Sequence, residues 1–193
     1  IKESVKWGLF VFPSHIINQF TPLLSKIILI QFGSLSSLGV MSIALRFTSL
    51  LFILTTAFKN SYLPIYYSYR KEGNKEKENE LIKTSENIWI ISCLLFLLVS
   101  LFSPPLIRLF TPISYHNASN LIWILSLGFL FNILWILFGA EIFYSKKTYW
   151  HTFITLISSV LSLSFIFLFV DVWGVYAIVA GMTIWWIVYS ILG

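Results

Sequence analysis

Polar side chains recur at helical spacing within the first long apolar stretch of the chain, residues 7–32. His15, Gln19 and Lys26 are four and seven residues apart, which places them along one side of an α-helix, and Asn18 widens this stripe. The other sides consist mainly of leucine, isoleucine, valine and phenylalanine. If the stretch crosses a membrane, a cation in hydrocarbon costs about 2.5–3.5 kcal/mol, so the stripe must face protein or water. Such a face predicts a place where a polar solute binds or crosses.

A second polar stripe lies in the next apolar stretch, residues 38–60. Ser42, Arg46 and Ser49 follow one another at intervals of four and three residues. If the two stretches form a helical hairpin, Lys26 and Arg46 lie at similar depth, and neither has an acidic neighbour at that depth. Two such cations need water, an anion or carboxylates from elsewhere. Three explanations remain open: an anion-binding cavity, compensation by another part of the protein, or side chains that reach the membrane surface.

The composition requires a membrane. Hydrophobic residues make up 58% of the chain and charged residues only 11%, and the mean hydropathy is +0.84. A soluble domain has about 25% charged residues, and a helix that spans a bilayer needs about 20 apolar residues. We therefore predict an all-α integral membrane protein, with residues 1–193 forming one bundle of six transmembrane helices. The predicted spans are about 7–32, 38–60, 88–110, 120–143, 148–170 and 173–192.

The basic residues predict how the chain is oriented. Of the thirteen lysines and arginines, most fall on one side if the spans alternate, and only Arg108 falls on the other. Because basic residues accumulate on the cytoplasmic side, the amino end and a loop over residues 68–87 are expected there. We expect this loop to be a solvated linker whose second half begins the third span as a helix. Lys59 lies near the same boundary and is expected to reach the surface by extending its side chain. The basic residues on the cytoplasmic side are Lys2, Lys6, Arg70, Lys71, Lys75, Lys77, Lys83, Lys146 and Lys147.

Several kinds of chemistry lack support in the sequence. It contains no paired carboxylates, no His/Cys cluster at metal-ligand spacing, no phosphate-binding glycine loop and no Ser-His-Asp set. We therefore expect no enzyme activity, no cofactor and no metal site. Lysines and glutamates are interleaved over residues 75–80, so the local charge nearly cancels and nucleic acid is not an expected partner. Membrane lipids are.

Prolines inside the first span also bear on function. Pro13 and Pro22 remove backbone donors and are expected to kink or break the helix. Freed carbonyl groups at membrane depth are tolerated beside a cavity or a neighbouring helix. Interrupted helices of this kind are typical of binding sites in transporters.

Short sequences at the ends of the predicted spans resemble a known family. They are Gly8-Leu9-Phe10-Val11-Phe12-Pro13, then Gly39-Val40 with Ser42 and Arg46, then Phe58-Lys59-Asn60-Ser61-Tyr62-Leu63-Pro64, then Phe143-Tyr144-Ser145-Lys146-Lys147-Thr148 and Gly174-Val175-Tyr176-Ala177. Together they resemble the carboxy-terminal half of Wzx-type O-antigen and polysaccharide flippases, which belong to the multidrug/oligosaccharidyl-lipid/polysaccharide exporter superfamily. The resemblance covers nearly the whole chain, and its motifs are loose.

The resemblance implies a twelve-helix transporter of two six-helix lobes in the bacterial inner membrane, with an amino-terminal lobe of the same polypeptide as partner. Its substrate would be an undecaprenyl-pyrophosphate-linked oligosaccharide, an O-antigen or capsule repeat unit, which crosses by alternating access. Lys26 and Arg46 would attract pyrophosphate or acidic sugars. The family commonly has an acidic–basic pair near residues 25–26, where this chain keeps only the base. Hydrogen bonds to sugar hydroxyls would come from His15, Asn18, Gln19, Ser42 and Ser49.

Two other functions remain alternatives. A cation-coupled drug or small-solute exporter of the same superfamily would need a carboxylate deep in the membrane, and Glu141 lies near the cytoplasmic end of its predicted span. A membrane scaffold without transport activity would have no use for the two polar stripes.

Overall fold

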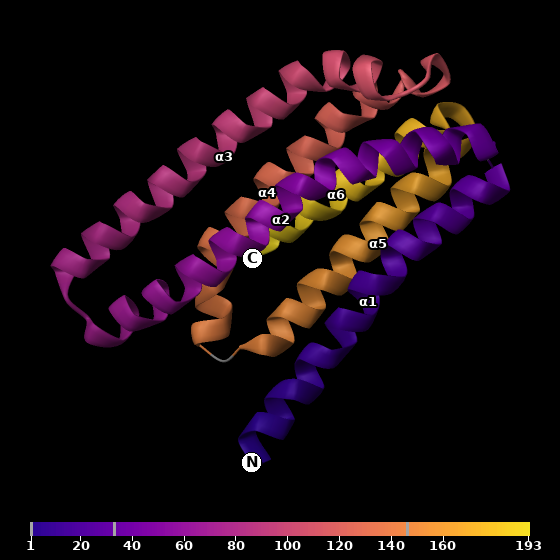
Figure 1. The fold of residues 1–193 in the computed structure, drawn as a ribbon. Helices are drawn as coiled ribbons and strands as arrows, with labels where there is room; N and C mark the ends of the chain where they lie inside the picture. Colours follow the sequence, from indigo (N-terminus) through magenta and orange to yellow (C-terminus); the bar gives the residue numbers. More distant parts are fainter. Residues whose placement is uncertain (1, 33, 146) are drawn as a thin grey trace.

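The computed structural model describes residues 2–32, 34–145 and 147–193, and it is all-helical (Figure 1). Five segments are long and apolar enough to cross a membrane: α2, α3, η1 with α4, α5 and α6. The polar stripe lowers the hydropathy of α1, so a sixth crossing stays a prediction. The elements are α1 (Lys2–Phe32), α2 (Leu35–Glu72), α3 (Lys75–Phe110), the short 3-10 helix η1 (Ile113–Tyr115), α4 (Ala118–Tyr144), α5 (Thr148–Trp173) and α6 (Val175–Leu192).

Local side-chain chemistry fixes the ends of the long helices. The Ser34 hydroxyl accepts a hydrogen bond from the Ser37 backbone N–H at 3.1 Å, which caps the start of α2. Gly73 ends α2 with a φ of 64°, a left-handed conformation that glycine adopts without strain. Asn74 then caps α3 by accepting from the Glu76 N–H at 3.0 Å. The turn between α2 and α3 is therefore only two residues long, Gly73 and Asn74.

The prediction of a loop over residues 68–87 is wrong, because α2 continues to Glu72 and α3 begins at Lys75. Lysine and glutamate are good helix formers, and acidic residues in a first helical turn interact favourably with the helix dipole. The ammonium group of Lys77 lies against the carboxylate of Glu72 across the turn. The expectation that the second half of this segment begins the third helix is confirmed.

Of the kink or break expected in α1, the break is wrong, since α1 continues through Pro13 and Pro22 as one helix. Close packing along α5 holds it. The Thr21 hydroxyl, next to Pro22, lies 2.9 Å from the Ile17 carbonyl oxygen and 3.1 Å from the Ser159 hydroxyl of α5. Packing against a neighbouring helix is one of the ways in which a helix tolerates the donor that a proline removes.

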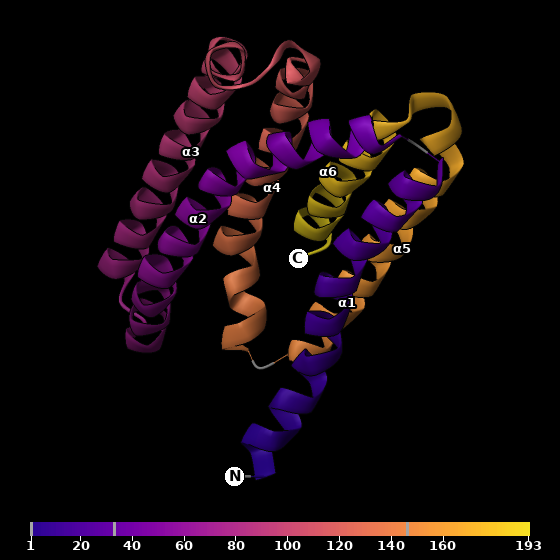
Figure 2. The same cartoon turned by 45° about the vertical axis from the view of Figure 1, so that its right-hand side comes forward.

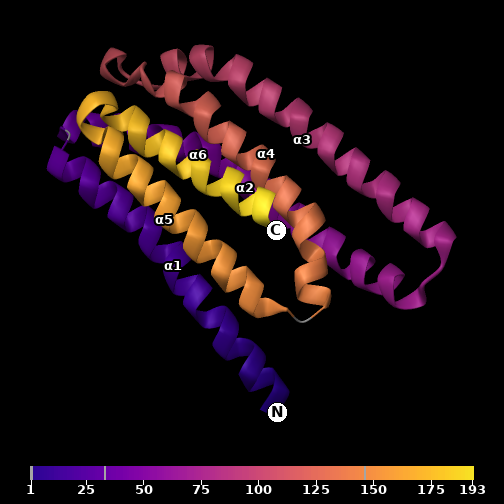
Figure 3. The ribbon, with the colours of Figure 1, turned by 180° about the vertical axis from the view of Figure 1, so that it is seen from behind.

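The helices alternate in direction and diverge from one end of the bundle (Figures 1 and 2). At one end of the bundle, the last turns of α1, α3 and α5 lie near the first turns of α2, α4 and α6. We call this end the closed end and the opposite end the open end. α6 lies between α4 and α5, which is clear from behind (Figure 3). α1 packs on α5, and α2 and α3 pack on α4, whereas α1 and α2 have few contacts with each other. The tight hairpin expected of the first two spans is therefore not formed along their length.

Two hydrophobic clusters follow from this divergence. The closed-end core is aliphatic, with Leu29, Met41, Ile107, Ile122, Ile166 and Ile178 all fully buried. The open-end core is largely aromatic and contains Tyr62, Tyr66, Phe129, Trp135, Trp185 and Tyr189. α5 and α6 pack tightly at Gly181, whose carbonyl accepts a 2.7 Å hydrogen bond from the Ser162 hydroxyl. A Cβ atom at this glycine would lie 2.3 Å from the Ile166 Cγ1 atom.

Candidate functional site

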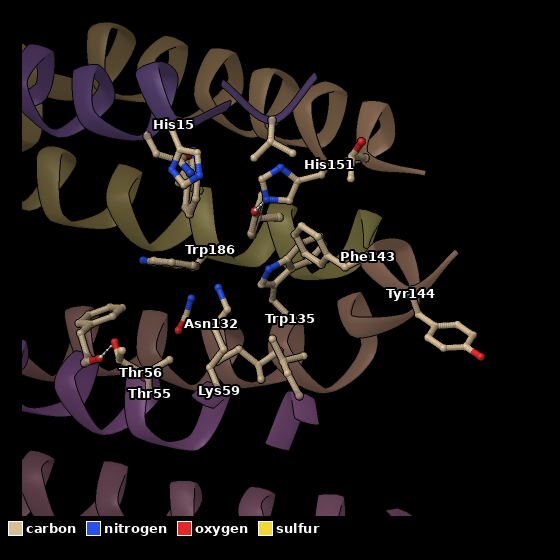
Figure 4. A pocket seen from close by; sticks show the side chains of 18 of the residues that line it. His15, Thr55, Thr56, Lys59, Asn132, Trp135, Phe143, Tyr144, His151 and Trp186 are labelled. Carbon is tan, nitrogen blue, oxygen red and sulfur yellow. Dashed lines mark hydrogen bonds between the residues drawn. The ribbon is translucent and has the colours of Figure 1, made fainter. Parts of the chain in front are cut away.

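The open end contains a cavity of about 1530 Å³ between α1 and α5 on one side and α2 and α4 on the other, with α6 behind it (Figure 4). None of the described residues that line it carries a carboxylate. The aromatic lining residues are Phe52, Tyr67, Trp135, Phe143, Tyr144, Tyr149, Trp185, Trp186 and Tyr189. The polar ones are His15, Asn18, Thr55, Thr56, Lys59, Asn132, Thr148 and His151.

Nitrogen-bearing side chains approach one another from opposite walls of the cavity. In Figure 4, His15 of α1 and His151 of α5 come from one wall, and Lys59 of α2 and Asn132 of α4 come from the other. His15 and Lys59 are exposed, whereas His151 and Asn132 are buried. The cavity therefore presents both accessible and fixed hydrogen-bonding groups.

His151 is held in place by the aromatic residues around it. Its Nε2 atom lies 2.7 Å from the Tyr189 hydroxyl. The ring centroids of Phe143 and Trp135 lie 5.0 and 5.7 Å from that of the imidazole. Its Nδ1 atom, like the Oδ1 atom of Asn18, is buried without a hydrogen-bond partner among the residues that the structure describes. Buried polar atoms are rarely left unpaired in proteins, so we expect water or a ligand to form hydrogen bonds with these two.

Stacked rings form the back of the cavity. Trp185 and Tyr189 are stacked with centroids 4.6 Å apart, and Trp135 lies 4.1 Å from Tyr189. The indole N–H of Trp185 donates a 3.0 Å hydrogen bond to the Ser159 hydroxyl, which fixes the orientation of that ring. Ser159 also contacts Thr21, so α1, α5 and α6 are connected at this point. The surface is a rigid apolar platform beside polar groups.

Three tyrosines and an ion pair lie at the mouth of the cavity. Tyr66 of α2 donates a hydrogen bond to the Oε2 atom of Glu141 on α4. The same oxygen lies 3.2 Å from the Arg70 Nε atom. Next to this cluster, the rings of Tyr67 and Tyr144 stack with centroids 6.1 Å apart. Glu141 is therefore engaged with α2 and does not line the cavity.

The structure divides the seven residues that the sequence singles out. His15 and Asn18 line the cavity. The others are outside it: Gln19, Lys26, Arg46 and Ser49 are exposed, and Ser42 is half-buried. The Ser42 and Ser49 hydroxyls donate to the Leu38 and Arg46 carbonyls of their own helix, at 2.8 and 2.6 Å.

The reason that the seven residues are not brought together is the packing of the closed end. Leu29, Met41 and Ala44 are fully buried beside the turns that carry Lys26 and Arg46. The open-end cavity does not extend to that level, since none of the residues of those turns is among its described lining.

Sequence reasoning missed most of the cavity lining. Lys59, expected to reach the membrane surface, points into the cavity instead (Figure 4). Asn132 was not recognised, because it is a single polar residue within an apolar run. Two signals were present. Thr148, His151 and Thr155 recur at helical spacing in the fifth span. Thr55, Thr56 and Lys59 lie within about one turn of each other in the second. The latter signal could have extended the polar face of the second span toward its cytoplasmic end.

Comparison of the chain with protein-family models, with curated proteins and with solved structures finds no match. The cavity and the sequence itself are therefore the basis for assigning a function.

Proposed function

We propose that the protein is one lobe of a bacterial inner-membrane flippase that moves a lipid-linked oligosaccharide by alternating access. The observation that carries the proposal is the open-end cavity, which combines a ring platform with amide, hydroxyl, imidazole and ammonium groups inside an apolar helical bundle. A sixth crossing by α1 and a second lobe are parts of the same proposal.

The chemistry of the cavity suits a sugar. A hexose has polar hydroxyls around its edge and C–H groups on its faces, so it binds between hydrogen-bonding side chains and aromatic rings. Asn132 and Thr56 supply the first kind of contact, and Trp185 and Trp186 the second. The volume of about 1530 Å³ exceeds the roughly 300–1,000 Å³ of ordinary small-molecule pockets, which favours more than one sugar ring.

The outer surface of the bundle suits the lipid tail. Large apolar side chains are exposed along every helix, among them Leu101 on α3 and Phe167 on α5. A polyprenyl chain therefore remains in hydrocarbon while its head group enters the cavity. The basic residues around the open end predict that this end faces the cytoplasm, where lipid-linked sugars are assembled in the proposed pathway.

The cation-coupled exporter is the weaker proposal. Ion coupling within the membrane needs an ionisable acid that faces the transport path. The described lining residues include none, and Glu141 is held by Tyr66 and Arg70. Lys26 and Arg46, exposed on this lobe, remain available to a second lobe or to the pyrophosphate.

Filling the cavity tests the proposal. Thr56→Trp adds an indole to the cavity and removes no packed side chain, since Thr56 is exposed and its hydroxyl bonds only to the Phe52 carbonyl. Leu50→Trp is the matched control, because Leu50 lies on the same helix, is 62% exposed and does not line the cavity. In the native host, we expect Thr56→Trp to abolish surface polysaccharide and to cause lipid-linked intermediates to accumulate, whereas Leu50→Trp leaves both unchanged. Normal surface polysaccharide with Thr56→Trp at wild-type protein levels would contradict the proposal.

A further inference from the structure

We infer that the open-end cavity recognises an acidic group carried on a sugar ring, held between Lys59 on one wall and His15 and His151 on the other. The inference rests on the proposed function and adds the chemical class of the head group.

The first step is the charge of the cavity. Its described lining contains one ammonium group and two imidazoles but no carboxylate. The carboxylate of α4, that of Glu141, is engaged with Arg70. Lys59 is therefore a cation without a counter-charge among the described lining residues, and a bound anion stabilises such a cation where the dielectric is reduced.

The second step is the geometry. The three groups come from three different helices, and Lys59 points toward the two imidazoles across the cavity (Figure 4). An anion between the walls is reached by donors from both sides. Hydrogen bonds to a charged group are stronger than those between neutral groups. Recognition of an acid is therefore the largest electrostatic contribution available at this site.

The third step excludes a simple inorganic ion as the whole ligand. Trp185 and Trp186 line the same cavity as Lys59, and neither ring contributes to the binding of a bare anion. Asn18 has a buried Oδ1 atom without a described partner, which is an acceptor suited to a hydroxyl group. An acidic group on a hydroxylated ring satisfies all of these features together. The acid is either a carboxylate, as in a uronic acid, or a phosphate, as in a sugar phosphate.

Binding to the purified full-length protein in nanodiscs tests the inference, with intrinsic tryptophan fluorescence as the readout. The probes are glucuronate, glucose 1-phosphate, glucose and inorganic phosphate. We expect at least one of the two acidic sugars to bind more tightly than both glucose and inorganic phosphate. Preference for glucuronate identifies a carboxylate, and preference for glucose 1-phosphate identifies a phosphate.

Variants connect the binding to the named residues. Lys59→Met keeps the length of the side chain, and we expect it to weaken binding of the acidic sugar by about tenfold or more without changing that of glucose. Lys83→Met is the matched control, since Lys83 is exposed on α3 and does not line the cavity. His15→Gln, also at an exposed residue, should likewise weaken the binding of the acidic sugar.

Two results would overturn the inference. One is glucose binding as tightly as the acidic sugars with no effect of Lys59→Met, which leaves the flippase proposal intact because a neutral sugar still occupies the cavity. The other is no binding of any sugar, or tight binding of inorganic phosphate alone. The Thr56→Trp measurement decides independently whether the flippase proposal itself stands.

Discussion

The closed end and the open end of this bundle use different means to hold the same helices together. At the closed end, aliphatic side chains such as Met41, Ile122 and Ile178 interlock with no exposed surface. At the open end, the contacts are made by rings and by polar bonds, including those from Tyr66 to Glu141 and from Trp185 to Ser159. A cavity lies where the aliphatic core is missing.

The difference shows how a helical bundle in lipid keeps a polar chamber. Lipid tails are as apolar as leucine, so dense packing rather than exclusion from water holds helices together. The closed end provides that packing and fixes the angles at which the helices diverge. The open end is then free to use large aromatic side chains and hydrogen bonds, which tolerate a ligand between them.

The largest effect is expected from a cavity made in the closed end. Ile178→Ala removes a fully buried side chain of α6. We expect a loss of about 2 kcal/mol in the free energy of unfolding, at the low end of the usual range because lipid removes the transfer-from-water component. Thermal unfolding in detergent measures it, with Leu168→Ala, at a 70% exposed residue of α5, as the control. Equal stability of the two variants would mean that the closed end is not the packed end.

The accessibility of the two ends to water should also differ. In a Cys93→Ser background, which removes the one cysteine, we expect Thr56→Cys to react with a membrane-impermeant maleimide and Ala44→Cys to stay unlabelled. Thiolates form and react only in contact with water, Thr56 lines the cavity and Ala44 is fully buried. Arg46→Cys tests the polar stripe of α2 in the same way: labelling there would indicate a second water-filled surface. An unreactive Thr56→Cys would mean that the cavity is dry.

The smallest effect is expected at the ion pair beside the cavity mouth. Glu141→Gln keeps an acceptor for Tyr66 but removes the charge that pairs with Arg70. The two charged side chains are 47% and 45% exposed, so we expect a change of under about 1 kcal/mol in thermal unfolding. Transport should continue. Loss of transport in a folded Glu141→Gln protein would instead favour the cation-coupled exporter.

Much of the fold follows from the sequence because long apolar runs and their spacing are local signals. The six predicted spans correspond to α1 to α6, and five of them are confirmed as long and apolar enough to cross a membrane. The loop over residues 68–87 was mispredicted because high charge predicts a solvated segment, and a solvated segment can be a linker or a helix. Lysines and glutamates also form good helices, and the chain turns only at Gly73 and Asn74.

The candidate site was less predictable, because a cavity depends on how helices diverge. Helical spacing puts His15 and Asn18 on one face of the first span and extends that face to Lys26. It does not indicate at which level a neighbouring helix packs against the span and ends the cavity. His151 and Asn132 enter the site through α5 and α4, far away in the chain. No periodicity within a single span reports such a meeting.

The close approach at Gly181 limits how this bundle could change shape. Ser162 and Ile166 of α5 fit against that glycine so tightly that sliding α5 along α6 would lose the contact. Through the Thr21–Ser159 contact, α1 travels with this pair. A swing that turned the chamber toward the opposite leaflet would therefore carry three helices as one rigid body.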